Sequence, residues 1–211
     1  MPQTASRGPG RPPAAKADET RKRIVNAARQ VFSERGYEGA TFQAIAMHAD
    51  LTRPAINHYF ASKRVLYTEV ADRTLELVVS AGIERARGES TLIGRLASFI
   101  TVAMEADAQH PRTAAFMATA VLESQRHPEL SNADNDAVRT TREFLCWAVS
   151  EAVASGELAP GVDVTAVSES LLLVLCGVGF YAGFVGSYQE VENILGTLRQ
   201  MVAGGLWTST A

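Results

Sequence analysis

The sequence predicts an all-α protein of about nine helices, in which a small three-helix unit precedes a larger helical body. Apolar residues recur at helical spacing along most of the 211-residue chain, and no segment alternates apolar and polar residues as a half-buried strand would. The breaks between the periodic segments contain Gly, Pro, Asn or Asp, which favour turns. A chain of this length can bury a sizeable core, either as one domain or as a small domain joined to a larger one.

The first helix is expected over residues 18–35, followed by Gly36 at the position where left-handed backbone favours glycine. Its apolar positions form one stripe at the i, i+3, i+4, i+7, i+8 spacing of an amphipathic helix: Ile24, Ala27, Ala28, Val31 and Phe32. Beyond the short helices described next, the pattern predicts helices over 62–87, 91–109, 112–126, 134–155, 163–186 and 188–206.

The most informative segment is 41–66, TFQAIAMHADLTRPAINHYFASKRVL. Thr41 and Thr52 can each cap a short helix by accepting a hydrogen bond from a free backbone N–H of its first turn. Residues 49–51 form the turn between the two helices. Pro54 falls in the first turn of the second helix, where its missing N–H costs little. The segment therefore predicts two short helices joined by a tight turn.

The second short helix is expected to leave a polar face exposed. Ile56 and Phe60 stand four residues apart and can anchor the helix to the core. The outward side chains are then Arg53, Ala55, Asn57, His58 and Tyr59. Such side chains can bind phosphates, hydrogen bond with base edges or touch a thymine methyl group. The arrangement fits a DNA-binding helix-turn-helix, and it also fits an αα-hairpin whose polar face meets only water.

The distribution of charge favours the DNA-binding interpretation. The formal net charge of the whole chain is only −3. However, residues 1–73 hold 12 Lys and Arg against 7 Asp and Glu, whereas residues 74–211 hold 8 against 16. A basic first part attracts phosphate, and an acidic remainder repels DNA. This asymmetry indicates a DNA-binding head on a body with another role.

Residues 1–17 are rich in Pro, Gly and Arg and poor in apolar side chains, so they are expected to form a flexible basic arm. Arg7 and Arg11 lie in the sequence RGPGRP, which resembles the core of an AT-hook. In an AT-hook the arginines enter a narrow A·T minor groove. A solvated tail with no fixed partner explains the same composition.

Residues 170–189 carry no charged side chain and approach the lower limit for spanning a bilayer. The strongly apolar part is only 171–185, and acidic residues rather than Lys or Arg bound it. We therefore expect no membrane span but a helix buried in a core or in a dimer interface. Gly179 and Gly183 would let two helices approach closely there.

Several other classes of function are not supported by the residues. Cys146 and Cys176 each lie in an apolar helical run and are expected to be buried free thiols. The four histidines are scattered, and the sequence contains no metal-ligand cluster, nucleophile elbow or phosphate loop. We expect no metal, no cofactor and no enzyme activity. The N-terminus lacks the apolar core of a signal peptide, so a cytoplasmic location is expected.

The segment 24–66 resembles TetR-family transcriptional regulators. IVNAARQVFSERGYEGATFQAIA at 24–46 and LTRPAINHYFASKRVL at 51–66 carry similar residues at the same spacing, and the likeness extends along the chain. It implies a helix-turn-helix DNA-binding domain, here residues 18–67, and a ligand-binding and dimerisation domain, here 68–211. It also implies a homodimer, in which each subunit contributes 163–186 and 188–206 to a four-helix interface. Two residues depart from the family pattern: Asp50, where glycine is common in the turn, and Ala44, where an acidic or polar side chain is common.

The resemblance also implies which residues contact DNA. Tyr59 and Lys63 occupy positions that usually hold phosphates, and Thr41 and Thr52 occupy helix starts that often do so. Residues that fall where the family reads bases or flanking phosphates are Arg53, Pro54, Ala55, Asn57 and His58. Arg53 can take both guanine acceptors, and Asn57 can pair with adenine in the same way. For His58 we favour a phosphate contact or exposure to solvent.

The resemblance further implies a cavity in the middle helices for a small apolar or amphipathic effector. The candidate lining residues are Phe99, Met104, Phe116, Met117, Trp147, Phe180, Tyr181 and Phe184, each of which also fits a simple core position. Glu123, Gln125 and Arg126 could orient a polar end of the effector or form a solvated face. The expected function is a homodimeric repressor that binds a palindromic operator and is released by its effector. An architectural DNA binder that relies on the arginine arm is the alternative.

Overall fold

The computed structural model of the chain describes residues 13–130, 136–186, 190, 191, 193, 194, 196 and 197. Within these residues the chain is helical and contains no strand, so the all-α expectation is confirmed. The helices are α1 (Pro13–Gly39), α2 (Phe42–His48), α3 (Arg53–Tyr59), α4 (Lys63–Leu75), η1 (Glu76–Ser80, π-helical), α5 (Ala81–Arg87), α6 (Leu92–Gln109), α7 (Thr113–Arg126), η2 (Pro128–Leu130, 3-10), α8 (Ala137–Ala154) and α9 (Val164–Phe184).

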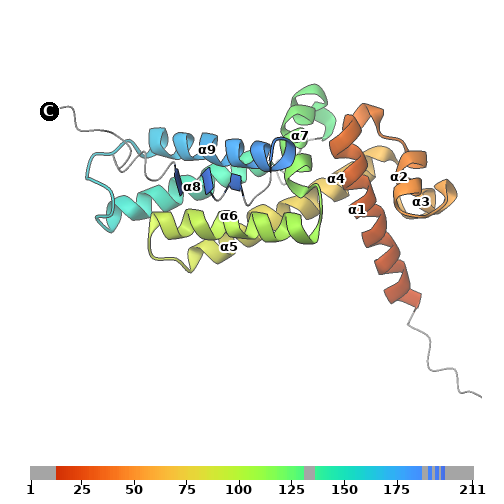
Figure 1. The fold of residues 1–211 in the computed structure, drawn as a ribbon, viewed down its shortest axis with the longest axis horizontal. Coiled ribbons are helices and arrows are strands. Elements are labelled where there is room, and N and C mark those ends of the chain that lie inside the picture. Colours follow the sequence, from red (N-terminus) through yellow and green to blue (C-terminus); the bar gives the residue numbers. More distant parts are fainter. Residues whose placement is uncertain (1–12, 131–135, 187–189, 192, 195, 198–211) are drawn as a thin grey trace, which may run out of the picture.

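Figure 1 shows a head and a body arranged along the longest axis of the molecule. The head consists of α1, α2, α3 and the start of α4, and in the body α5, α6, α8 and α9 run along the long axis. Helix α7 stands between the two parts and packs on both α1 and α9. Helix α4 leads from the head into the body, where it continues through η1 into α5.

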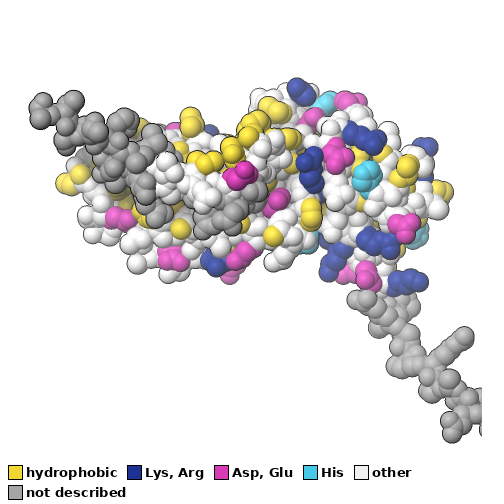
Figure 2. All heavy atoms as spheres, viewed as in Figure 1, with side chains coloured by type: hydrophobic (Ala, Val, Ile, Leu, Met, Phe, Trp, Pro, Cys, Tyr) yellow, Lys and Arg dark blue, Asp and Glu magenta, His cyan; other side chains and the backbone are white. Residues whose placement is uncertain are grey.

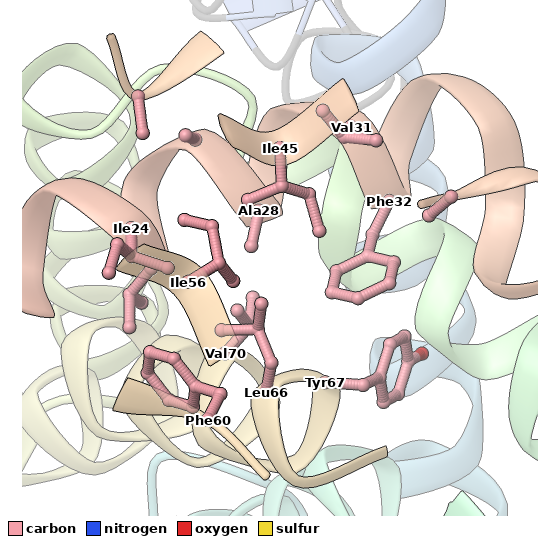
Figure 3. Close-up of a cluster of buried hydrophobic side chains, with 14 of the residues drawn as sticks. Ile24, Ala28, Val31, Phe32, Ile45, Ile56, Phe60, Leu66, Tyr67 and Val70 are labelled. Atoms are coloured by element: carbon pink, nitrogen blue, oxygen red, sulfur yellow. The ribbon is translucent and has the colours of Figure 1, made fainter. Parts of the chain in front are cut away.

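The core of the head joins all four of its helices (Figure 3). Its fully buried members include Ile24, Ala28, Val31 and Phe32 of α1, Ile45 of α2, Ile56 of α3, and Leu66 and Val70 of α4. Each large apolar side chain contributes about 1.5–3 kcal/mol when it leaves water. Because α2 and α3 are only seven residues long, this shared core rather than intrinsic helix propensity holds them in place.

The local signals at the helix ends are confirmed. Thr41 and Thr52 each accept a hydrogen bond from the backbone N–H three residues later, at 3.1 and 3.4 Å. Ser62 caps α4 in the same way, at 3.2 Å. Asp50 adopts a left-handed conformation with φ 50° in the turn between α2 and α3. Asp tolerates this geometry better than most residues, so the departure from glycine at this position leaves the turn intact.

Some helix boundaries differ from the expected ones. Helix α1 begins at Pro13, five residues before the expected start, because proline is compatible with the first turn of a helix. Gly36 interrupts the end of α1 with φ 67°, as its expected position past the helix implies. The expected helix over 62–87 is continuous, but its five residues 76–80 are π-helical. Most of the expected helix over 188–206 lies outside the described residues.

Helix α9 is apolar but largely exposed in the single chain. Leu173, Phe180 and Phe184 expose 74, 55 and 48% of their surface. Of the two expected settings for this helix, the chain's own core does not apply, because no described neighbour covers the face that carries these residues. Burial in a dimer interface stays a prediction. By length and composition α9 could cross a membrane, with a mean hydropathy of 1.7.

The small residues of α9 and its cysteine have different environments. A Cβ at Gly183 would lie 2.7 Å from the backbone N of Ala115, so this glycine lets α9 approach α7 within the chain. A Cβ at Gly179 would meet nothing within 4 Å. Cys176 is exposed and Cys146 is half-buried, which corrects the expectation of two buried thiols. Cys176 lies on the exposed face of α9 that also carries Leu173 and Phe180.

An ion-pair network joins α1 to α4 at the edge of the head core. Arg21 and Arg73 both pair with Glu69, at 2.8 and 2.7 Å. The guanidinium carbon of Arg21 also lies 4.5 Å from the centroid of the Phe60 ring. The hydrogen bond from Arg21 is the main cause that lowers the pKa of Glu69, and the hydrogen bond from Arg73 adds to it.

Replacing Glu69 should destabilise the protein in a pH-dependent way. At pH 7, Glu69→Gln should lower the free energy of unfolding by about 1 kcal/mol, because a partly exposed charge pair is screened by water. The folded-state pKa of Glu69 lies below its unfolded value of about 4.3. The contribution is therefore present above that value and is lost as the pH falls through the folded-state pKa. Urea unfolding at pH 7 and pH 3.5 measures this difference.

The control for this prediction is Glu34→Gln, because Glu34 is an exposed carboxylate on the same helix as Arg21. Its effect on the free energy of unfolding should stay within about 0.5 kcal/mol. A Glu69→Gln effect of equal size at both pH values would contradict the role of the ionised carboxylate.

Candidate DNA interface and effector cavity

Helix α3 has one buried face and one polar face. Ile56 and the C-cap residue Phe60 are buried, with 0 and 1% exposure, and hold the helix on the head core. The described outward face is formed by exposed Thr52, Arg53, Pro54, Asn57 and His58, with Ala55 and Tyr59 half-buried. The structure therefore brings Thr52 and the predicted α3 residues together around the exposed side of this helix.

Arg53 and Asn57 stand four residues apart on α3, so they lie on the same side of the helix. Both are exposed, and neither side chain forms a hydrogen bond with the described part of the chain. Their donors and acceptors are therefore available to another molecule. A helix of this kind fits the major groove, where such side chains reach base edges.

Lys63 has an internal role that the sequence does not predict. Its Nζ donates to the backbone oxygens of Tyr37 at 2.7 Å and Glu38 at 3.3 Å. The same atom lies 4.3 Å from the centroid of the Tyr37 ring. Lys63 thereby satisfies carbonyl groups at the end of α1, and one of its three N–H donors remains for another acceptor.

Arg23 is a positioning residue that sequence reasoning missed. Its Nε and Nη2 donate to the backbone oxygen of Ala49 at 3.1 and 2.6 Å, and Nη2 donates to that of Asp50 at 3.0 Å. These bonds hold the turn of the helix-turn-helix against α1. No local signal could identify this contact, because it joins residues 26 and 27 positions apart.

The positive charge of the molecule is concentrated on the head. On the face that Figure 2 shows, most Lys and Arg side chains lie at the end formed by α1 to α4. Several of these basic side chains already bind partners within the chain: Arg21, Arg23, Lys63 and Arg73. The buried Arg29 donates to Asn26 and Thr74. The number of basic residues in the sequence therefore exceeds the number free to meet phosphate. Arg7 and Arg11 lie outside the described residues.

A cavity of about 420 Å³ lies between α4, α7 and the start of α8. Its volume falls within the usual range for small-molecule sites. Only two of the eight predicted lining residues, Phe116 and Met117, belong to it. The described lining is Tyr67, Ala71, Thr74, Leu75, Phe116, Met117, Ala120, Val121, Ser124, Gln125, Pro128, Leu130, Asp136, Ala137 and Val138.

The other six predicted residues lie elsewhere. Phe99 is buried in the body core and stacks on Phe144 at 5.5 Å. Trp147 lies under the guanidinium of Arg95, whose central carbon is 4.6 Å from the ring centroid. Phe180 and Phe184 contact each other on the outer face of α9, and Met104 and Tyr181 are half-buried. Aromatic composition alone cannot distinguish a cavity wall from a core or an outer helix face.

The three residues expected to orient a polar end of the effector do not lie together. Gln125 lines the cavity. Glu123 is 5% exposed and points toward the end of α1, where its Oε1 would lie 2.8 Å from a Cβ at Gly36. Arg126 is exposed, and its closest approach to Glu123 is 4.0 Å. Of these three residues, Gln125 alone can therefore orient a polar group inside this cavity.

Tyr67 connects the cavity to the core of the head. It lines the cavity, and its ring packs edge-on against Phe32 at 5.0 Å (Figure 3). It also packs edge-on against Tyr37 at 5.3 Å. Burial is the main cause that raises the pKa of its hydroxyl, which therefore stays protonated near neutral pH. A molecule in the cavity would touch a side chain that also supports α1.

His127 lies at the same junction, beside carboxylates from three segments. Its Nε2 is 3.7 Å from both Glu38 at the end of α1 and Glu123 of α7, and its Nδ1 is 3.3 Å from Glu129 of η2. Its ring is 5.3 Å from that of Tyr37. The sequence pattern offers no signal for this contact between head and body.

Comparisons with known proteins agree with this arrangement. The family described as bacterial regulatory proteins, tetR family, matches residues 24–70, which run from α1 into α4. The HTH-type transcriptional regulator SrpR of Pseudomonas putida is 32% identical over 203 residues, covering 92% of this chain and 86% of SrpR. The HTH-type transcriptional regulator UidR of Escherichia coli strain K12 is 28% identical over 162 residues, covering 77% of this chain and 81% of UidR.

A solved structure has the same fold. AibR in complex with isovaleryl coenzyme A and operator DNA matches with a TM-score of 0.61 and 18% identity, covering 84% of this chain and 97% of AibR. At this identity the likeness extends to the fold alone. The identity to SrpR extends over most of both chains, and the family match covers the helix-turn-helix. The chain therefore belongs to the TetR family of bacterial transcriptional regulators.

Proposed function

We propose that this transcriptional regulator is a cytoplasmic homodimeric repressor, which binds a palindromic operator and leaves it when a small effector enters the body. The observation that carries the proposal is the polar face of α3, where Arg53 and Asn57 are exposed and unpaired within the described chain while Ile56 is buried behind them. A polar, basic helix face mounted on a rigid apolar core is what direct readout of the major groove requires.

We assign the DNA contacts to two groups of residues. Arg53 would take the two acceptors of a guanine, and Asn57 would pair with an adenine. Tyr59, Thr41 and Thr52 would contact phosphates. Pro54, Ala55 and His58 would meet bases or flanking phosphates at the edges of the same surface. Lys63 would contribute its remaining donor while it holds the end of α1. Phosphate contacts position the protein, whereas the base contacts specify the sequence.

We propose that the exposed face of α9 is covered by α9 of a second copy. Leu173, Cys176, Gly177, Phe180 and Phe184 are exposed at spacings of three and four residues, which places them on one side of the helix. A Cβ at Gly177 would meet nothing within 4 Å, so a partner helix could approach closely there. The residues 163–186 would thus supply one helix of each subunit to the interface, and 188–206 would supply the second.

Effector binding would act through α4, which belongs to both the head and the cavity. Tyr67, Ala71, Thr74 and Leu75 line the cavity, and α4 begins four residues after the end of α3. An effector that binds more tightly to one orientation of α4 would shift the population toward that orientation. The two recognition helices would then no longer match half-sites about 34–36 Å apart. Release of DNA follows from this mismatch.

Substitutions on α3 should reduce operator binding. With an operator selected from a random-sequence pool, Arg53→Ala should weaken binding by about 5- to 150-fold, which corresponds to about 1–3 kcal/mol, and should relax the preference at one base position. Tyr59→Phe should weaken binding more uniformly across sequences. Fluorescence anisotropy titrations at several salt concentrations measure both effects.

Arg87→Ala is the matched control, because it removes an exposed arginine from the body rather than from α3. Its affinity for the operator should stay within about twofold of wild type. Undiminished operator binding by both Arg53→Ala and Tyr59→Phe would contradict the assignment of these residues.

A charge placed on the exposed face of α9 should break the dimer. Leu173→Asp should yield a folded monomer in sedimentation velocity, because an unpaired carboxylate in an apolar interface is costly. Operator affinity should fall sharply, since only one half-site can then be held at a time. Ile93→Asp, which alters a 58% exposed side chain on α6, should remain dimeric.

Circular dichroism of both variants should retain the wild-type helical signal. A monomeric wild-type protein at micromolar concentration would contradict the proposed interface. Co-sedimentation of the wild-type protein with lipid vesicles would likewise contradict it, because lipid would then cover α9.

A further inference from the structure

The cavity between α4 and α7 has no positively charged wall. Among its fifteen described lining residues there is no lysine or arginine, and the only charged side chain is that of Asp136. Asp136 is exposed, and its Oδ1 accepts a hydrogen bond from the backbone N–H of Arg139 at 2.9 Å. That bond caps α8, so the positive end of the helix is already compensated by a carboxylate.

The segments around the cavity add further negative charge. Of the described residues, 113–130 and 136–138 contain three acidic residues, Glu123, Glu129 and Asp136, and one arginine. That arginine, Arg126, points to solvent with a side-chain exposure of 70%. The buried carboxylate of Glu123 points toward the end of α1 and does not line the cavity, but it adds to the raised pKa of the lining residue Tyr67. The described lining therefore carries one negative charge and no positive charge, and the buried Arg29 lies behind it, donating to Thr74 Oγ1 at 3.3 Å.

The inner wall offers apolar and aromatic surface. The rings of Tyr67 and Phe116 have centroids 5.6 Å apart and are tilted by 51° to each other. Both residues line the cavity together with aliphatic side chains and Met117. Aromatic faces attract cations as well as apolar groups, and the amide of Gln125 can accept one hydrogen bond from an ammonium group.

We propose that this cavity binds a lipophilic cation and discriminates against anions, with Asp136 as the residue that determines the preference for charge. The proposal rests on the function proposed above, in which a ligand in the body controls DNA binding, and it specifies the chemical class of that ligand. A ligand with phosphate groups, such as the isovaleryl coenzyme A bound by AibR, would bring several negative charges to a wall that offers them no partner.

A pair of probes with the same shape and opposite charge tests the proposal. Tetraphenylphosphonium is a lipophilic cation, and tetraphenylborate is an anion of nearly the same size. Calorimetric titration of the full-length protein should give a dissociation constant at least tenfold lower for the cation. Asp136→Asn keeps a side-chain oxygen for the helix cap and should weaken binding of the cation by about fivefold, as expected for one partly exposed charge.

Three further variants locate the effect. Asp163→Asn removes an exposed carboxylate that caps α9 in the same way but does not line the cavity, so it should leave both dissociation constants unchanged. Val138→Trp should fill the cavity and abolish binding of both probes, and Ala120→Phe provides a second filling variant if the first does not fold.

The outcomes are distinguishable. Equal or tighter binding of tetraphenylborate, or an Asp136→Asn effect no larger than that of Asp163→Asn, would overturn the preference for cations. Operator release is measured separately by anisotropy. If tetraphenylphosphonium binds the wild-type protein and not the filled variants but leaves the operator bound, the preference for charge stands and the proposed release of DNA fails.

Discussion

The packing of α4 against α1 determines where the rest of the molecule lies. Leu66, Tyr67 and Val70 of α4 are buried in the core of the head, and Tyr67 also lines the cavity of the body. Helix α4 thus contributes side chains both to the core of the head and to the lining of the cavity. Helices α2 and α3 are too short to be stable alone, so their positions follow from the surface that α1 and α4 present to them. The recognition surface and the cavity are consequently attached to one rigid element.

Local structure could be predicted from the sequence where the physical cause is local. The caps at Thr41 and Thr52 depend on a side chain and a backbone N–H three residues apart, and the left-handed Gly36 depends on its own backbone. These features need no knowledge of tertiary contacts. The face of α3 was predictable for the same reason, because two buried residues four positions apart define the opposite side.

The cavity could not be predicted in the same way. Phe180 and Phe184 have the composition of a pocket wall, but α9 turns them away from the chain. Tyr67, which does line the cavity, belongs by its sequence position to the head. Arg23 and Lys63 look like charges for DNA, although both bind backbone oxygens about 26 residues away. In each case the deciding contact joins segments distant in sequence, and periodicity carries no information about such contacts.

The π-helical segment at 76–80 has a geometric consequence for the whole molecule. It lies within an unbroken run of helix from 63 to 87, and a π turn accommodates one more residue than an α turn. The wider turn takes up the extra residue, so α5 leaves it facing nearly as it would after a regular α turn that is one residue shorter. Deleting one residue from 76–80 would therefore restore a regular helix and leave α5 in place, whereas a deletion in a regular stretch of the same helix would rotate everything that follows by about 100°. The π turn is thus the point at which the length of this helix can change without turning the body relative to the recognition surface.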